Sequence, residues 1–127
     1  MGEYWHIVNL DKKEMFATPP YKFWEWMANE HSKVLFWLCA KRQDMKRGFG
    51  SPEYEKYPTL GRWAGDRVIV IGDYDPEFKK IIAGCKDITL EVLEDIERYF
   101  EEEGPKEIYL IFKDYTDFMK KCREGGL

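Results

Sequence analysis

The stretch "GRWAGDRVIVIGDYD" at residues 61–75 carries the side chains of this sequence that are best suited to chemistry. Arg62 and Arg67 can each hold a carboxylate or a phosphate through two parallel hydrogen bonds, and Trp63 offers a flat face for stacking. This end of the stretch predicts an anion-binding or nucleotide-binding loop. The structural alternative is that both arginines pair with acids inside the fold while the tryptophan packs at the edge of the core.

The other end, "GDYDPE", brings three acids close together in sequence: Asp73, Asp75 and Glu77. Carboxylate oxygens at alternating positions suit Mg²⁺ or Ca²⁺, and an aspartate here could also serve as a general base, with His6 as a candidate neighbour. The remaining positions of an EF-hand loop are absent. The alternative is that the two aspartates build tight turns before Pro76, and that His6 is a structural residue.

A run of four β-branched residues separates these two ends and predicts a central strand. Because a strand rises by roughly 3.3 Å per residue, we expect Asp66 and Asp73 to lie about 20 Å apart. They cannot act as one carboxylate pair, so any site lies at one end of the strand or at the other.

Five runs rich in β-branched, aromatic or other apolar residues predict the strands of a single sheet. They are "YWHIVNL" (4–10), "EMFAT" (14–18), "VLFWLCA" (34–40), "DRVIVIGD" (66–73) and "EIYLIF" (107–112). The run at 34–40 is apolar on both faces, which fits a strand covered on both sides or a buried helix.

Helical periodicity predicts three helices that pack against this sheet. They are a segment after Tyr21, "DITLEVLEDIERYFEEEG" (87–104) and "DYTDFMKKCRE" (114–124). In the first helix Trp24 and Trp26 could form a homodimer face if they are exposed, or both could belong to the core. We therefore expect one α+β domain over residues 1–127, interrupted by a long loop at about 41–61.

Composition limits the classes of function. A net charge of −4 and a pI of about 5.3 argue against a protein that binds the DNA backbone. Three widely spaced cysteines form no CxxC pair, so no zinc site or disulfide framework is implied, and Cys39 is expected to be buried. The longest apolar run is too short to span a bilayer. These features predict a protein of the reducing cytoplasm, without a membrane segment.

The start of the long loop is a weaker candidate for a binding site. It carries four basic residues, which are Lys41, Arg42, Lys46 and Arg47. Aromatic residues follow them, and basic side chains interleaved with aromatic ones suit single-stranded nucleic acid. The overall negative charge favours the alternative, a solvated loop without nucleic-acid binding.

Several of these motifs together resemble one family. "YWHIVNLDKKE", "KFWEWMAN", "GRWAGDR" and "GDYD" are similar to motifs of an uncharacterised family of small microbial and fungal proteins. The resemblance covers roughly residues 4–103 and departs at "TPPYKF". It implies a shared fold and no assigned activity. "VIVIGDYD" also resembles the first metal motif of DHH-type phosphoesterases, but no Asp-His-His follows it in this sequence.

The sequence shows no catalytic signature, so it favours a non-catalytic binding or protein-interaction domain without a cofactor. Arg62, Trp63 and Arg67 would then contact an unknown protein or a small anionic ligand. The alternative is a small enzyme for a phosphorylated or nucleotide substrate, with Mg²⁺ at the "GDYD" turn.

Overall fold

The computed structural model describes residues 3–17, 22–41 and 56–124. Its strands are β1 (Trp5–Asn9), β2 (Glu14–Phe16), β3 (Val68–Gly72) and β4 (Lys86–Asp87). Its helices are α1 (Phe23–Ala28), the 3₁₀ helix η1 (Glu30–Lys33), α2 (Val34–Cys39), α3 (Phe78–Ile82), α4 (Thr89–Glu103) and α5 (Lys106–Glu124). Strands and helices are mixed along the chain, as the sequence predicts for an α+β fold.

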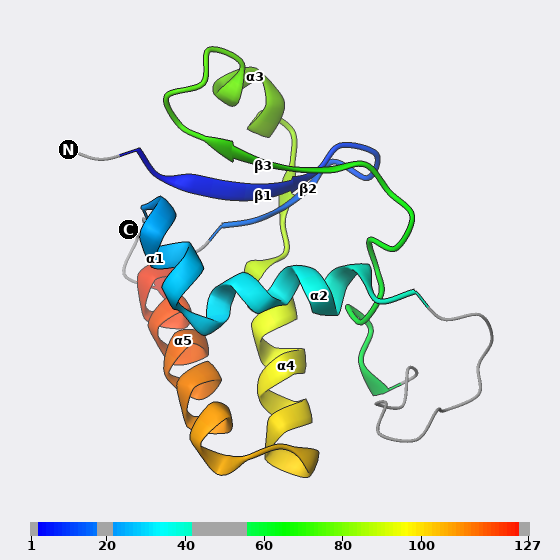
Figure 1. The fold of residues 1–127 in the computed structure, drawn as a ribbon, viewed down its shortest axis with the longest axis vertical. Coiled ribbons are helices and arrows are strands. Elements are labelled where there is room, and N and C mark those ends of the chain that lie inside the picture. The colour runs from blue at the N-terminus through cyan, green and yellow to red at the C-terminus, as the bar shows by residue number, and fades with distance from the viewer. Residues whose placement is uncertain (1–2, 18–21, 42–55, 125–127) are drawn as a thin grey trace.

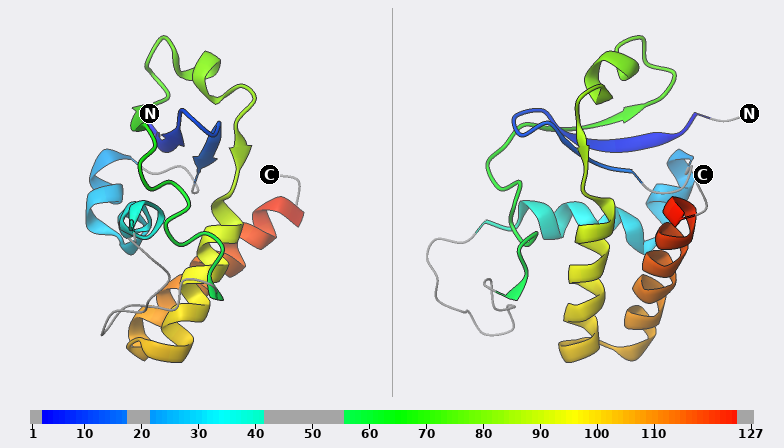
Figure 2. Two further views of the ribbon diagram at one scale, coloured as in Figure 1. Left: turned by 90° about the vertical axis from the view of Figure 1, so that its right-hand side faces the viewer. Right: turned by 180° about the vertical axis from the view of Figure 1, so that it is seen from behind.

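The described strands form one sheet in the order β3-β1-β2-β4. β1 is antiparallel to both β2 and β3, whereas the short β4 runs parallel to β2. Figure 1 shows α3 on one side of this sheet and α1, α2 and α4 on the other. The α4–α5 hairpin projects away from the sheet, as the two views of Figure 2 confirm.

Two of the five predicted strands are helices and one short strand, β4, was not predicted, so the sheet has four described strands instead of about five. The run at 34–40 forms α2, because Val34, Trp37 and Leu38 are buried at the i, i+3, i+4 spacing of one helix face. The run at 107–112 is the first part of α5. Phe112, Thr116 and Met119 are all buried at helical spacing, so a single helical face extends beyond the short window that suggested a strand.

Two further expectations, on the place of β3 and on Cys39, need correction, and one strand was missed. β3 was expected to be central, but it is the last strand on its side of the described sheet. β4 was not predicted, since two residues carry no detectable alternation. Cys39 is exposed instead of buried because it ends α2 on the side away from the core.

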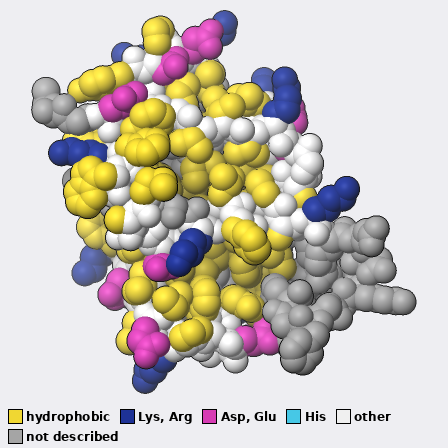
Figure 3. Space-filling model, viewed as in Figure 1, with side chains coloured by type: hydrophobic (Ala, Val, Ile, Leu, Met, Phe, Trp, Pro, Cys, Tyr) yellow, Lys and Arg dark blue, Asp and Glu magenta, His cyan; other side chains and the backbone are white. Residues whose placement is uncertain are grey.

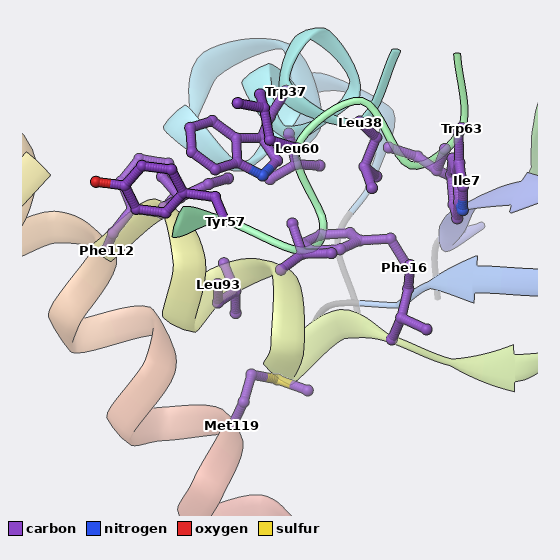
Figure 4. Packing of buried hydrophobic residues seen from close by; sticks show 14 of the residues in the cluster. Ile7, Phe16, Trp37, Leu38, Tyr57, Leu60, Trp63, Leu93, Phe112 and Met119 are labelled. Atoms are coloured by element: carbon purple, nitrogen blue, oxygen red, sulfur yellow. The ribbon is translucent and has the colours of Figure 1, made fainter. Parts of the chain in front are cut away.

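The hydrophobic core joins the sheet to all the larger helices. Figure 4 shows Ile7 and Phe16 from the sheet, Trp37 from α2, Leu93 from α4 and Phe112 from α5 within one cluster of buried side chains. Tyr57 and Leu60, at the end of the predicted long loop, are also buried there. Among the described residues, no helix is both long and apolar enough to cross a membrane.

Candidate functional site

Arg62 and Trp63 of "GRWAGDR" both bind the carboxylate of Glu14 at the start of β2. Arg62 donates from Nε to both oxygens at 3.1 Å and from Nη2 to Oε2 at 2.6 Å. Trp63 donates from its indole N–H to Oε1 at 2.8 Å. Glu14 is 5% exposed and Trp63 is fully buried. The anion that this end of the stretch holds is therefore a side chain of the protein itself.

The electrostatics of this contact favour the ion pair. Burial raises the pKa of Glu14, but the hydrogen bonds from Arg62 and Trp63 and the charges of Arg62 and Lys12 together outweigh that effect, so the pKa lies below its ordinary value. The hydrogen bond to Glu14 likewise raises the pKa of Arg62. Both groups are charged at neutral pH, and their polar atoms are used within the fold.

The second half of "GRWAGDR" holds the turn between β1 and β2. Asp66 accepts a hydrogen bond from Asn9 Nδ2 at 2.9 Å and forms an ion pair with Lys12. Arg67 binds Asp11 with its main-chain N–H and with Nε, both at 2.8 Å. These hydrogen bonds lower the pKa values of the two aspartates.

The two segments 9–14 and 61–67 thus form one network, which we call the hairpin clasp. It consists of Asn9, Asp11, Lys12, Glu14, Arg62, Trp63, Asp66 and Arg67. A positive φ of 83° at Gly65 lets the chain turn between the two halves of the clasp. The motif pair "VNLDKKE" and "GRWAGDR" therefore has a direct structural explanation, because each motif binds the other.

The acids of "GDYDPE" lie at the opposite end of β3, where both aspartates accept main-chain hydrogen bonds from within the fold. Asp73 Oδ1 accepts from the Tyr4 N–H at 2.9 Å, and Asp75 Oδ1 accepts from the Glu77 N–H at 2.8 Å. Asp75 and Glu77 are exposed. Among the described residues, no group of three or more His, Cys, Asp or Glu side chains is arranged to hold a metal ion.

His6 lies in β1 and faces α3, where its ring centroid is 5.1 Å from that of Phe78. Burial lowers the pKa of His6, while the Asp73 charge opposes that shift. Its Nδ1 is buried without a hydrogen-bond partner. His6 and Asp73 therefore interact electrostatically, but no hydrogen bond between them is present to make an acid–base pair.

Of the four basic residues at the start of the long loop, Lys41 belongs to the part of the chain that the structure describes. Lys41 is exposed two residues after the end of α2. Arg42, Lys46 and Arg47 lie outside the described residues, so the proposed contact with single-stranded nucleic acid stays a prediction.

The exposed surface carries a feature that the candidate residues do not include. In α1, Phe23, Trp24 and Met27 point outward and are more than half exposed, whereas Trp26 is buried. Phe36 on α2 is 84% exposed. Figure 3 shows hydrophobic side chains gathered on the face of the molecule that carries these helices. We call the side chains of Phe23, Trp24, Met27 and Phe36 the apolar face.

Sequence reasoning missed two of the residues that matter here. Glu14 shares a face of β2 with Phe16, and this period-two spacing already placed an acid on the buried side of a strand. Phe36 was missed because the run at 34–40 was read as a strand. The tryptophans of α1 were left open, and the structure separates them into an exposed Trp24 and a buried Trp26.

Comparisons with models of known protein families, with curated proteins and with solved structures found no match. The resemblance to the family of small microbial and fungal proteins therefore stays a prediction.

Proposed function

We propose that this chain is a non-catalytic protein-interaction domain that binds its partner through the apolar face. The observation that carries the proposal is the orientation of α1. The helix has a hydrophobic stripe at the spacing that normally faces a core, yet Phe23, Trp24 and Met27 of that stripe point outward. Large apolar side chains that gather on one surface are typical of protein-interaction sites.

The chemistry of the other candidate residues supports the same choice. Arg62 and Trp63 already bind Glu14. Asp73 accepts from the Tyr4 N–H before β1, and Asp75 accepts from the Glu77 N–H in a turn. Arg67 binds Asp11, but its side chain is 76% exposed. Of the predicted anion-contacting residues, Arg67 is thus the one that we retain in the proposal as a contact for a partner's acid.

The proposal is tested by capture from an extract of the native cells. The immobilised full chain is compared with the double variant Trp24→Gln, Met27→Gln, and bound proteins are quantified after cross-linking. Glutamine keeps helix propensity while it removes the apolar surface. We expect the double variant to lose the specifically bound proteins.

The matched control is Leu110→Gln, which removes an apolar side chain of α5 that is 46% exposed and lies outside the apolar face. This variant should capture the same proteins as the unmodified chain. Equal capture by the unmodified chain and the double variant would contradict the proposal.

A further inference from the structure

The strand β3 has an open edge in the described part of the molecule. The main chains of Arg67 and Asp73, at its two ends, are hydrogen-bonded toward β1 at 2.9 Å. Since alternate residues of an antiparallel strand direct their main-chain groups to opposite sides, Val68, Val70 and Gly72 point theirs away from β1. The Gly72 carbonyl accepts a turn hydrogen bond, which leaves its N–H and both groups of the two valines at the edge.

The apolar face lies beside this edge. Val70 pairs with Ile7, so both side chains lie on the sheet face that packs against the core and α1. Val70 is nevertheless 49% exposed. In the left view of Figure 2, α2 lies beneath β3 and α1 projects past the edge of the sheet on the same side. A strand added next to β3 would place every second side chain over the exposed side chains of these helices.

The charges at the two ends of β3 determine which end of such a strand should be basic and which acidic. Arg67 precedes β3 and Asp73 follows it, and both side chains lie on the same face because they are an even number of residues apart. In an antiparallel added strand, an acid opposite Arg67 and a base opposite Asp73 would form favourable cross-strand pairs. The preferred segment is therefore basic at its N-terminal end and acidic at its C-terminal end.

We propose that β3 binds an extended segment of a partner protein as an added antiparallel strand. The segment has a basic residue, three apolar residues at alternate positions facing α1 and α2, and an acidic residue. This inference rests on the proposed function and names the kind of partner that the surface takes. Main-chain hydrogen bonds would supply affinity, and the apolar face and the two charges would supply selectivity.

A second copy of the chain offers a strand of the same pattern, since its own β3 lies between Arg67 and Asp73. A two-fold pairing of two β3 strands would, however, put α1 and α2 of both copies on the same side of the joined sheet. There α1 already projects past the edge (Figure 2). An isolated strand brings no helices to that space, so we favour a partner segment over a second copy.

The test uses the peptide Lys-Val-Thr-Val-Thr-Val-Glu and the isotope-labelled full chain in two-dimensional NMR. We expect saturable shifts of the amides of Val68, Val70 and Gly72, with a dissociation constant of about 1 mM or lower. The charge-reversed peptide Glu-Val-Thr-Val-Thr-Val-Lys should bind about tenfold more weakly, because it places like charges opposite Arg67 and Asp73.

The variant Val70→Pro removes an N–H that faces the added strand and none that faces β1, so it should abolish binding. Val70→Thr keeps this N–H and should bind the peptide like the unmodified chain. No saturable shift at β3, or equal binding of both peptides to the unmodified chain, would overturn the inference. A dimer of the chain that Val70→Pro dissociates would also overturn it in favour of a second copy.

The two proposals can fail separately. If capture from the extract depends on Trp24 and Met27 while neither peptide binds, the proposed function stands and the β3 inference is wrong. If the first peptide binds at β3 while Trp24→Gln and Met27→Gln do not change capture, the apolar face is not the interaction surface and the β3 site remains.

Discussion

Glu14 is the partner that Arg62 and Trp63 of "GRWAGDR" bind. The sequence indicates that Arg62 and Trp63 can hold a carboxylate, and in the structure they do so. The carboxylate comes from the start of β2, 48 residues from Arg62 in sequence. Spacing within the motif cannot reveal this partner, because the contact depends on how the β1–β2 hairpin lies against residues 61–67. The residue types were therefore predictable, but their pairing was not.

Glu14→Gln should destabilise the protein by about 2 kcal/mol, since it weakens the hydrogen bonds of a charged, buried acceptor and leaves Arg62 without its counter-charge. Urea unfolding followed by tryptophan fluorescence measures the change. Glu77→Gln is the matched control because Glu77 is exposed, and it should alter stability by less than about 0.5 kcal/mol. Similar costs for the two variants would contradict the role that we assign to Glu14.

The same residue should make stability depend on pH. The pKa of Glu14 in the folded state lies below its ordinary value of 4.5, so the ionised form stabilises the fold. This contribution is present above pH 4.5 and is lost as the pH falls through the lowered folded pKa. The stability difference between the unmodified protein and Glu14→Gln should therefore shrink on acidification. A difference that is constant from pH 7 down to pH 3 would contradict this.

At the scale of elements, β-branched runs were more reliable than mixed apolar runs. β1 was predicted from its β-branched and aromatic residues, β3 from its run of valine and isoleucine, and α4 from its long apolar stripe. The predictions for 34–40 and 107–112 were wrong because an apolar run of five to seven residues fits a buried strand and a helix face equally well. For 107–112, only the continuation through Met119 distinguishes the two.

The pairing of β3 predicts opposite outcomes for prolines at neighbouring positions. The N–H of Val70 points to the open edge, whereas that of Ile71 points to His6 in β1. Ile71→Pro should cost about 3 kcal/mol or more because it removes a ladder hydrogen bond, while Val70→Pro should cost much less. Urea unfolding of both variants gives the comparison. If Val70→Pro is the more damaging one, the register of β3 is wrong.

Thr59 connects α2 to α4 through buried hydrogen bonds. Its hydroxyl accepts from the Trp37 indole N–H at 3.0 Å and donates to Asp95 at 2.6 Å. Thr59→Val should cost about 1–3 kcal/mol, since it leaves the indole N–H buried without an acceptor. Thr116→Val is the comparison, because that buried hydroxyl bonds the Phe112 carbonyl of its own helix and the Glu97 carboxyl, and its loss leaves no buried ring N–H without an acceptor. In thermal unfolding, the melting temperature of Thr59→Val should be clearly lower than that of Thr116→Val.

At the scale of the whole molecule, one cluster of buried residues joins the sheet to the α4–α5 hairpin, which projects from it in Figure 1. It includes Ile7 and Phe16 from the sheet as well as Phe112 and Met119 from α5. The composition predicts such a core, since aromatic residues make up 17% of the chain. It does not predict which aromatic residues stay outside, because that depends on how much of each helix the sheet covers.

Trp24 and Trp26 allow a test of which aromatic residues are buried and which are exposed within a single helix. Trp26 is buried and donates its indole N–H to the Trp5 carbonyl at 3.0 Å, whereas Trp24 is 66% exposed. Trp26→Gln should cost about 3 kcal/mol or more, in line with the loss of a large buried side chain. Trp24→Gln should change stability by less than about 0.5 kcal/mol, because it removes little buried surface.

Urea unfolding of the two variants, with far-ultraviolet circular dichroism as the probe, measures both costs without relying on tryptophan fluorescence. Equal costs would mean that α1 is rotated relative to the sheet, and the apolar face would then belong to the core. Unequal costs in the expected order mean that Trp24 contributes little to folding. Its hydrophobic surface would then be available for a partner without loss of the fold, which is the condition that an interaction domain has to meet.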